Sequence, residues 1–253
     1  MADVNITARL HERLRRSLSR STVAGSLPVL FFGDLFTATA ATIGINPSFR
    51  EYLDRSGHEL DGASRRFETL TSLGAADRLS LTDEQCQRAV GTMRRYFDLG
   101  RPVYDDWFGP IGFVLRGMAL RYETGAVAHL DLVQEATRQT WSDFAKAAPE
   151  QAAALLRDDE VFFRWQLETF PLRLVVCNGR TALEATRRVL GAPIERSGQF
   201  ERVTWSVGSG SAGGRAVRVA GWNLALARAG LLPHEQIRLG QKLAAALVET
   251  APG

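Results

Sequence analysis

Short apolar runs bounded by turn residues alternate along this chain with stretches of helical periodicity. The short runs predict buried strands, because they are rich in β-prone residues and end at polar or turn-forming positions. They cover residues 29–32, 40–45, 126–132, 172–177, 203–207 and 216–220. Helical spacing predicts helices over residues 82–99, 107–122, 141–147, 149–156, 160–170, 181–190 and 233–248. Strands that alternate with helices indicate an α/β fold with a largely parallel sheet.

Residues 1–25 are predicted to form a helical extension of a single domain that spans residues 1–253. Apolar side chains recur there at helical spacing, at Ile6, Leu10, Leu14 and Leu18. Arginines surround this apolar stripe, at Arg9, Arg13, Arg15 and Arg16. We interpret the arginines as a solvated face rather than a DNA contact, because charged residues opposite an apolar stripe ordinarily face water.

The bulk composition is that of a globular protein. Apolar residues make up 45% of the 253 positions and charged residues 23%, which are ordinary values for a folded soluble chain. No stretch reaches the length of a membrane helix, and the charged N-terminus lacks an apolar export signal. We therefore expect a cytoplasmic protein without a membrane partner. The net charge of +3 permits nucleic-acid binding but does not require it.

The cysteine and histidine content argues against a metal centre. The only cysteines, Cys86 and Cys177, are too few to ligate an iron–sulfur cluster, and a disulfide between them is left open. The four histidines show no ligand spacing. We predict no metal, no iron–sulfur cluster and no cofactor.

The glycine-rich segment 208–214 is the one low-complexity piece of the chain. A dinucleotide-binding fingerprint needs a strand before it and a helix after it, whereas an apolar strand follows this segment. The absence of a lysine excludes a Walker-type phosphate loop. We predict a mobile connection between two strands that makes no contact with a nucleotide.

The run at residues 40–45 ends abruptly at Asn46 and Pro47. Ligands of parallel α/β sheets bind just beyond the carboxyl ends of the strands, so Asn46 stands where a reactive polar group is expected. Gly44 would let a ligand or a neighbouring backbone approach closely. The alternative is a strand that simply ends in an Asn-Pro turn.

Residues 44–48, G-I-N-P-S, resemble the first motif of the uracil-DNA glycosylase superfamily. The resemblance is to the mismatch-specific thymine/uracil branch, in which the motif is G-I-N-P-G. Other segments follow the family's order. The sequence GHELDGASRRF at residues 57–67 parallels the branch's pocket loop and leads into a helix over 67–73. Residues 128–133 and 174–179 parallel its second and third strands, and residues 219–227 take the place of its second motif.

The resemblance covers residues 29–248 and implies a three-layer α/β/α sandwich with a central, mostly parallel sheet. It implies a monomeric DNA glycosylase that flips uracil or a related base out of the stack and hydrolyses its N-glycosidic bond. Asn46 would hold and orient the attacking water. The base would lie against Gly44, Ile45, Pro47, Ser48, Phe49, Leu60, Asp131, Trp222 and Asn223. The DNA would be contacted by Arg65, Arg66, Leu226 and Arg228.

Four positions depart from the family's pattern. Leu60 stands where members often stack the base on an aromatic ring, with Phe49 and His58 as possible substitutes. Asp131 replaces a base-reading Asn, although an ionised carboxylate only accepts hydrogen bonds. Trp222 and Asn223 replace a His-Pro-Ser motif whose imidazole would stabilise charge on the leaving base. An indole or amide N–H could donate one hydrogen bond instead.

Several of the candidate residues also have a structural alternative. Asp131 could cap a turn, Trp222 could pack in the core, and residues 178–179 are interpreted as a tight turn rather than part of the site. Arg65 and Arg66 could form a solvated face. If the resemblance holds, we expect Asn46, Asp131 and Trp222 to converge at the carboxyl ends of their strands.

Two other functions compete with a glycosylase. A non-catalytic or weakly active nucleic-acid-binding relative would explain the altered second motif. An unrelated α/β hydrolase is suggested by Gly33-Asp34 after an apolar run, but that Asp is not followed by a nucleophilic Ser.

Overall fold

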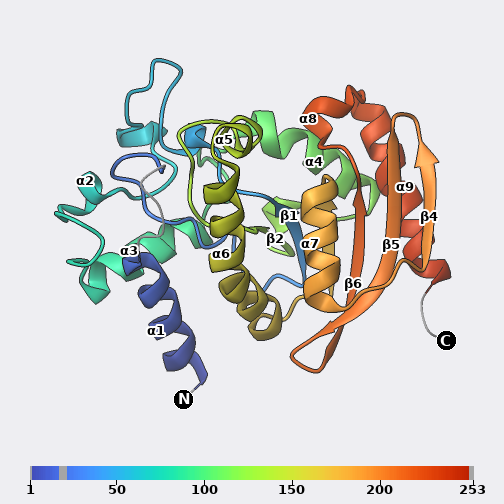
Figure 1. Ribbon diagram of the computed structural model, residues 1–253, viewed down its shortest axis with the longest axis horizontal. Coiled ribbons are helices and arrows are strands. Elements are labelled where there is room, and N and C mark those ends of the chain that lie inside the picture. The colour runs from blue at the N-terminus through green and yellow to red at the C-terminus, as the bar shows by residue number, and fades with distance from the viewer. Residues whose placement is uncertain (1, 17–21, 251–253) are drawn as a thin grey trace. The chain divides into compact units, whose positions relative to one another are not determined.

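The computed structural model describes residues 2–16 and 22–250 and contains a six-stranded sheet with the order β2-β1-β3-β6-β5-β4 (Figure 1). The neighbours among β2, β1, β3 and β6 are parallel, whereas β5 is antiparallel to both β6 and β4. The strands are β1 (Ala40–Gly44), β2 (Val127–Asp131), β3 (Leu174–Asn178), β4 (Arg196–Phe200), β5 (Val203–Ala212) and β6 (Arg215–Trp222). The fold is therefore α/β with a mostly parallel sheet, as predicted.

Nine α-helices lie within the described residues. They are α1 (Ala2–Arg15), α2 (Leu70–Leu73), α3 (Asp83–Arg94), α4 (Asp105–Gly117), α5 (Trp141–Ala147), α6 (Pro149–Thr169), α7 (Arg180–Leu190), α8 (Leu226–Ala229) and α9 (Pro233–Glu249). Three short 3-10 turns complete the list, η1 (Phe49–Glu51), η2 (Gly62–Ser64) and η3 (Tyr122–Thr124). None of the helices in the described ranges is long and apolar enough to cross a membrane.

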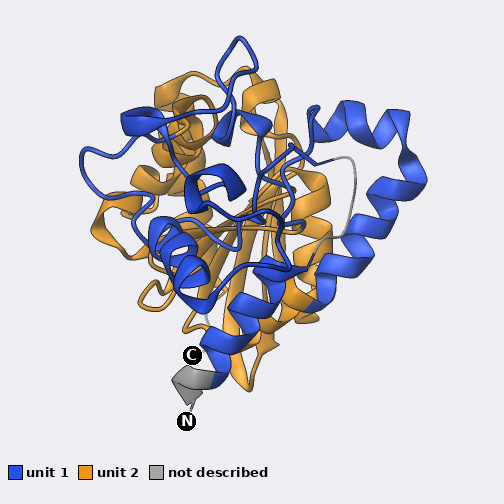
Figure 2. Ribbon diagram, turned by 90° about the vertical axis from the view of Figure 1, so that its left-hand side faces the viewer, with its two compact units in different colours: residues 1–33, 46–103, 133–161 blue, residues 34–45, 104–132, 162–253 orange. Residues whose placement is uncertain are grey.

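The chain divides into two compact units, coloured separately in Figure 2. Unit 1 comprises residues 1–33, 46–103 and 133–161, and unit 2 comprises residues 34–45, 104–132 and 162–253. Unit 2 contains the whole sheet, while unit 1 is built from helices and long connections. The expectation of a single domain stays a prediction.

Helices cover both faces of the sheet in unit 2. Successive residues of β6 point to opposite faces of the sheet, so their contacts identify the helix on each face. On one face, a Cβ atom on Gly221 would lie 2.9 Å from the Cδ1 of Leu183 in α7. On the other, the Arg218 guanidinium donates to the carbonyl of Leu247 in α9 at 2.9 Å. Figure 1 accordingly shows α7 in front of the sheet and α9 behind it. The strands β1 and β2 are buried throughout their lengths, as parallel strands covered on both faces must be.

An aromatic cluster lies in the core of unit 1. The rings of Phe67 and Tyr96 are stacked with their centroids 5.1 Å apart, and Phe32 meets both edge-on. Phe67 is fully buried at the end of the predicted pocket loop. It therefore anchors that loop, and the helix after it is shorter than predicted, α2 beginning only at Leu70.

The glycine-rich segment 208–214 corrects one prediction, because most of it is strand. Gly208 and Gly210 lie within β5. Their Cβ atoms would lie 2.0 Å from the carbonyl oxygen of Pro193 and 2.4 Å from that of Leu190. These glycines permit a close backbone approach and do not provide mobility. Only Gly213 and Gly214, with φ of 55° and 74°, form the turn to β6.

Three further predictions of secondary structure are corrected. Residues 29–32 are buried but do not form a strand; Val29 instead donates its N–H to the carbonyl of Gln134. The helices predicted over 149–156 and 160–170 are one continuous helix, α6. The strand β4 was not predicted because its residues are mostly polar and exposed, a pattern common at sheet edges.

Candidate functional site

Asn46 directly follows Ile45 at the end of β1, and its side-chain amide is held by acceptors within unit 1. The Nδ2 group donates to the Pro47 carbonyl at 3.0 Å, to the Glu135 carbonyl at 3.4 Å and to the Thr137 hydroxyl at 3.0 Å. The Thr137 hydroxyl in turn donates to the Gln139 carbonyl at 2.8 Å. Two residues of the segment after β2, Glu135 and Thr137, therefore hold the side-chain amide of Asn46 in place.

The partners of Asn46 also decide which way its amide faces. Backbone carbonyls only accept hydrogen bonds, and the single Thr137 proton is committed to Gln139. The nitrogen of Asn46 must therefore face these groups. Its oxygen, Oδ1, takes part in no hydrogen bond within residues 2–16 and 22–250. Because Asn46 is half-buried, Oδ1 is a fixed acceptor that a water molecule can reach.

The residues after Asn46 form a tight turn. Pro47 is buried, and the Ser48 hydroxyl caps the turn η1 by accepting the N–H of Arg50 at 3.2 Å. Phe49 is half-buried beneath the Arg50 guanidinium, whose carbon lies 5.2 Å from the ring centroid. Ser48 therefore has a structural role at the start of η1, and Phe49 presents part of its ring to solvent.

The loop at residues 54–67 lies in unit 1 beside this turn. Leu60 is half-buried and donates its N–H to the Tyr52 carbonyl at 2.7 Å. His58 is exposed, with its Nδ1 3.7 Å from Asp54. The structure thus leaves Leu60 and Phe49 as half-buried apolar surfaces and His58 as an exposed ring.

Three arginines of unit 1 are joined through backbone carbonyls. Arg66 donates to the carbonyl of Arg50 at 2.7 Å, and Arg101 donates to the carbonyl of Arg66 at 3.2 Å. Glu51 lies 4.0 Å from Arg66, and the other predicted DNA contact, Arg65, lies 3.9 Å from Glu68. Arg101 was missed by the sequence analysis because it is distant along the chain from the predicted loop.

In unit 2, Asp131 ends β2 within a buried chain of polar side chains. The Nε2 of His129 lies 3.3 Å from Asp131 Oδ1, and His129 Nδ1 lies 2.8 Å from the Thr42 hydroxyl. Thr42 is also hydrogen-bonded to the Tyr122 hydroxyl at 2.7 Å. Burial raises the pKa of Tyr122 well above its usual range, so its hydroxyl stays protonated and can donate.

Trp222 ends β6 as a fully buried side chain. Its Nε1–H donates to Asn178 Oδ1 at 3.0 Å, and the same oxygen accepts the N–H of Leu226 at 3.0 Å. The buried side chain of Asn178 thus links β3 to β6 and to the short helix α8. The sequence analysis interpreted residues 178–179 as a tight turn. The signal for this link was a polar residue, Asn178, at the end of a buried strand.

The remaining predicted residues of unit 2 follow Trp222 along the chain. Asn223 is half-buried and accepts the N–H of Thr204 through Oδ1 at 2.9 Å. Leu226 is buried at the start of α8, whereas Arg228 is exposed. Asn223 therefore joins β5 to the end of β6, and Arg228 is available to solvent.

The sheet keeps Asp131 and Trp222 apart, because β1 and β3 lie between their strands. At the usual spacing between strands their backbones are roughly 14 Å apart. The side chain of each is engaged with a different neighbour, His129 and Asn178 respectively. Asn46 belongs to the other unit, so its convergence with these two residues stays a prediction.

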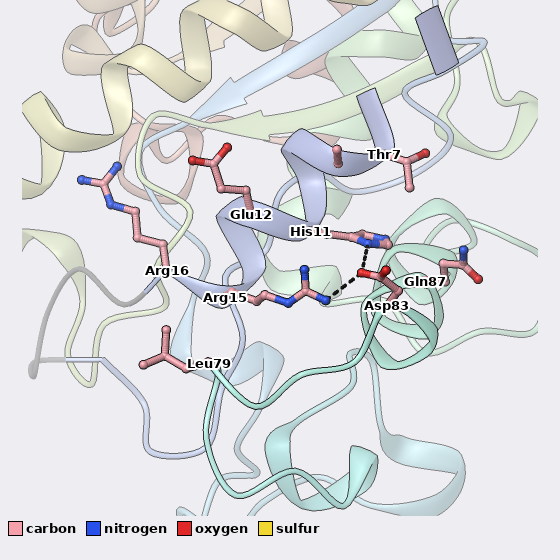
Figure 3. A pocket seen from close by; sticks show the side chains of 9 residues that line it. Thr7, His11, Glu12, Arg15, Arg16, Leu79, Asp83 and Gln87 are labelled. Atoms are coloured by element: carbon pink, nitrogen blue, oxygen red, sulfur yellow. Dashed lines mark hydrogen bonds and ion pairs between the residues drawn. The ribbon is translucent and has the colours of Figure 1, made fainter. Parts of the chain in front are cut away.

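A separate cavity of about 940 Å³ opens between α1 and α3 (Figure 3). Asp83 holds two groups there, the Nδ1 of His11 at 3.1 Å and the guanidinium of Arg15 at 2.7 Å. Arg15 is therefore paired rather than part of a purely solvated face. None of the residues predicted for the site lines this cavity.

Metal-binding and thiol chemistry find little support in the described residues. Within residues 2–16 and 22–250, no group of His, Cys, Asp and Glu side chains could hold a metal ion. Cys86 and Cys177 are free and buried, so they form no disulfide. Burial raises the pKa of Cys177 to about 12, so this thiol is a poor nucleophile at neutral pH.

Comparison of the chain with models of known protein families gives no match, and comparison with curated proteins gives no significant match.

Proposed function

We propose that this protein is a DNA glycosylase that hydrolyses the N-glycosidic bond of uracil or a related deaminated or mismatched base. The observation that carries the proposal is the fixed amide of Asn46. Three acceptors hold its nitrogen and leave Oδ1 to accept a hydrogen bond. An acceptor held in this way can orient a water molecule for attack at a sugar carbon. The amide follows a buried parallel strand within the sequence G-I-N-P-S.

The proposed reaction depends on positioning rather than on a strong base. An amide oxygen cannot remove a proton from water efficiently, so Asn46 would contribute by holding the nucleophile at the correct distance and angle. The departing base would carry most of the developing charge, and groups that stabilise it would supply the remaining rate enhancement. Flipping the nucleotide costs a few kcal/mol, less at a mismatch.

The topology of unit 2 supports the proposed uracil-DNA-glycosylase-like fold. The parallel part of the sheet begins with β1. The next strand in the sequence, β2, pairs with one side of β1, and β3 pairs with the other side. Such an order creates a switch point between β1 and β3, where α/β proteins bind their ligands. The strand ends at this point are Gly44, followed by Ile45, and Asn178. A three-layer α/β/α sandwich of that family remains our proposal.

Base recognition is proposed for Asp131 together with the backbone from Gly44 to Phe49. Asp131 accepts hydrogen bonds when ionised and could take the N3–H of uracil. Leu60 and Phe49 would supply apolar surface for stacking, since both are half-buried.

The DNA backbone is proposed to contact Arg65 and Arg66, together with Arg101. Arg66 and Arg101 each donate to a backbone carbonyl, which accepts the hydrogen bond without carrying a negative charge, and guanidinium groups suit phosphate oxygens. Glu51 and Glu68 lie near Arg66 and Arg65 and would compete with a phosphate for them. Arg228 is exposed at α8 and would add a contact, and Leu226 would have to leave its buried place to fill the gap in the stack. We propose a monomer that works in the cytoplasm without a cofactor.

A second candidate function is a nucleic-acid-binding protein of the same fold without catalytic activity. One observation favours it. The indole N–H of Trp222, which could have stabilised the leaving base, is buried and donates to Asn178. A protein with no donor at that place would bind a flipped base but cleave its N-glycosidic bond slowly or not at all.

One experiment separates the two candidates. The purified protein is incubated with single-stranded and duplex oligonucleotides that carry uracil, or thymine opposite guanine, and free base is measured alongside binding. A glycosylase releases base from at least one substrate. Binding without release on every substrate supports the non-catalytic alternative, and the absence of both removes the two candidates together.

A further inference from the structure

Four charged side chains are buried together in unit 1. Arg13 comes from α1, Arg78 from the connection before α3, Glu135 from the segment after β2, and Asp159 from α6. Their exposed side-chain fractions are 3%, 9%, 0% and 1%. An ionised group away from water must be paired. This quartet of two positive and two negative charges meets that requirement, because each charge has a partner of opposite sign within it.

The contacts within the quartet are bidentate. Arg78 donates to the two carboxylate oxygens of Glu135 at 2.8 and 2.9 Å. Arg13 donates to the two carboxylate oxygens of Asp159 at 3.2 and 3.0 Å, and it also reaches Glu135 at 3.4 Å. Paired hydrogen bonds of this kind fix direction as well as distance. The carboxylate of Glu135 is therefore immobilised from two sides.

Glu135 connects the quartet to Asn46. Its carbonyl accepts the Asn46 amide at 3.4 Å, and Thr137, two residues further on, accepts the same amide at 3.0 Å. On the other side of Glu135, the N–H of Gln134 donates to Asp159 Oδ2 at 2.9 Å. The stretch 134–137 is thus held at its backbone and at its side chain, and it holds Asn46.

We propose that the quartet of Arg13, Arg78, Glu135 and Asp159 positions Asn46 for reaction, and this inference rests on the proposed glycosylase function. The buried charges fix the stretch 134–137, whose two acceptors keep the Asn46 nitrogen turned inward and Oδ1 turned to the water. If the stretch shifts, the amide can rotate and present a donor where an acceptor is needed. These four residues act through Asn46 and do not touch the substrate.

The proposal also gives the N-terminal helix a role. Arg13 was predicted to lie on a solvated face, but it is buried and paired. Helix α1 therefore supplies one of the four charged residues of the quartet, and its loss should disturb the other three.

The test is a double-mutant cycle between Arg78→Met and Asn46→Ala on base release. Arg78→Met should lower kcat about 10- to 100-fold, the range expected for a small misplacement, and leave KM close to its original value. Added to Asn46→Ala, it should cause no further loss of kcat, because the two residues act as a unit. Multiplied losses in the double variant would overturn the proposal.

A matched control and a milder variant guard against general unfolding. Arg15→Met removes another arginine of unit 1, one that pairs with Asp83, and should leave kcat unchanged. If Arg78→Met does not fold, Thr137→Val removes one acceptor of the Asn46 amide, and Thr137→Ser should restore kcat. Equal kcat in the valine and serine variants would also overturn the proposal.

A readout without activity separates this proposal from the proposed function. The two amide protons of Asn46 are assigned in the NMR spectrum by their disappearance in Asn46→Ala. In Thr137→Val and Arg78→Met they should move and exchange faster with solvent than in Arg15→Met. Unmoved signals contradict the positioning role whether or not the wild-type protein releases a base. Absence of base release with moved signals contradicts only the glycosylase function.

Discussion

The carboxylate of Asp131 packs directly on Gly44 of the neighbouring strand. A Cβ atom on Gly44 would lie 2.3 Å from Asp131 Oδ1 and 3.1 Å from the Cε1 of His129. The glycine of the G-I-N-P-S sequence thus makes room for a polar side chain of the same sheet. The sequence predicted room at Gly44 for a ligand or a neighbouring backbone, whereas the side chain of Asp131 takes this space in the structure.

Gly44→Ala should consequently destabilise the protein. The new methyl group must displace Asp131 or the strand backbone, and forcing extra volume into a packed core costs about 1–3 kcal/mol. Urea unfolding measures the change. Gly112→Ala is the control, because a Cβ atom there meets nothing within 4 Å and the replacement favours the helix α4. Equal stabilities of Gly44→Ala and the wild type would show that Asp131 does not need this space.

Asp131→Asn should raise uracil release near neutral pH. An amide both donates and accepts, which suits the alternating edge of uracil, whereas an ionised carboxylate only accepts. Base release by the two proteins is compared near neutral pH. Equal release by the two proteins would remove the base-reading role of Asp131 and leave only its contact with His129.

Asp159→Asn should gain stability relative to the wild type as the pH rises. Burial raises the pKa of the Asp159 carboxyl above its ordinary value of 3.8, despite the neighbouring Arg13. The folded state therefore binds this proton more tightly than the unfolded chain. The stability that this group contributes is fully present below the unfolded pKa and is lost as the pH rises through the folded pKa. Asparagine does not titrate and avoids that loss.

Unfolding free energies of the wild type and Asp159→Asn, measured between pH 3 and 8, check this sign. Asp158→Asn, an exposed neighbour in α6, should show no such divergence. A wild type that gains stability relative to Asp159→Asn as the pH rises would mean that Arg13 outweighs the effect of burial.

Arg66→Met and Arg101→Met should each weaken DNA binding and reduce its salt dependence. One lost phosphate contact lowers the slope of log K against log salt by about 0.9 for duplex DNA. Fluorescence anisotropy over a range of salt concentrations gives the slope. Arg157→Met, an exposed arginine of α6, is the control. Slopes that do not differ from the wild type would assign both arginines to loop structure alone.

The sequence predicted the parts of the fold that depend on local pattern. The parallel strands and the long helices α7 and α9 were found within a few residues, because burial imposes a regular spacing on apolar positions. The edge strand β4 was missed because its exposed positions carry polar residues. The break predicted inside α6 covered residues 157–159. It includes Asp159, a charged residue that is buried and paired with Arg13 of another helix.

The candidate site could be predicted only in part, for a similar reason. Asn46 was found because it follows a strand in a short, distinctive sequence. Its partners Glu135 and Thr137 lie 89 and 91 residues further along the chain. Nothing in the local pattern of an isolated glutamate indicates that its carboxylate will be buried and bound by Arg13 and Arg78. Tertiary structure alone brings those groups together.

The most direct test of the account is single-turnover release of uracil by the wild type and Asn46→Ala, with enzyme in excess over a uracil-containing oligonucleotide. We predict release by the wild type and a rate at least about 100-fold lower for Asn46→Ala, as expected when a nucleophile loses its orientation, with DNA binding retained by both. Equal rates for the two proteins, or no release by the wild type from single-stranded or mismatched substrates, would contradict the assignment of Asn46 as the group that orients the water.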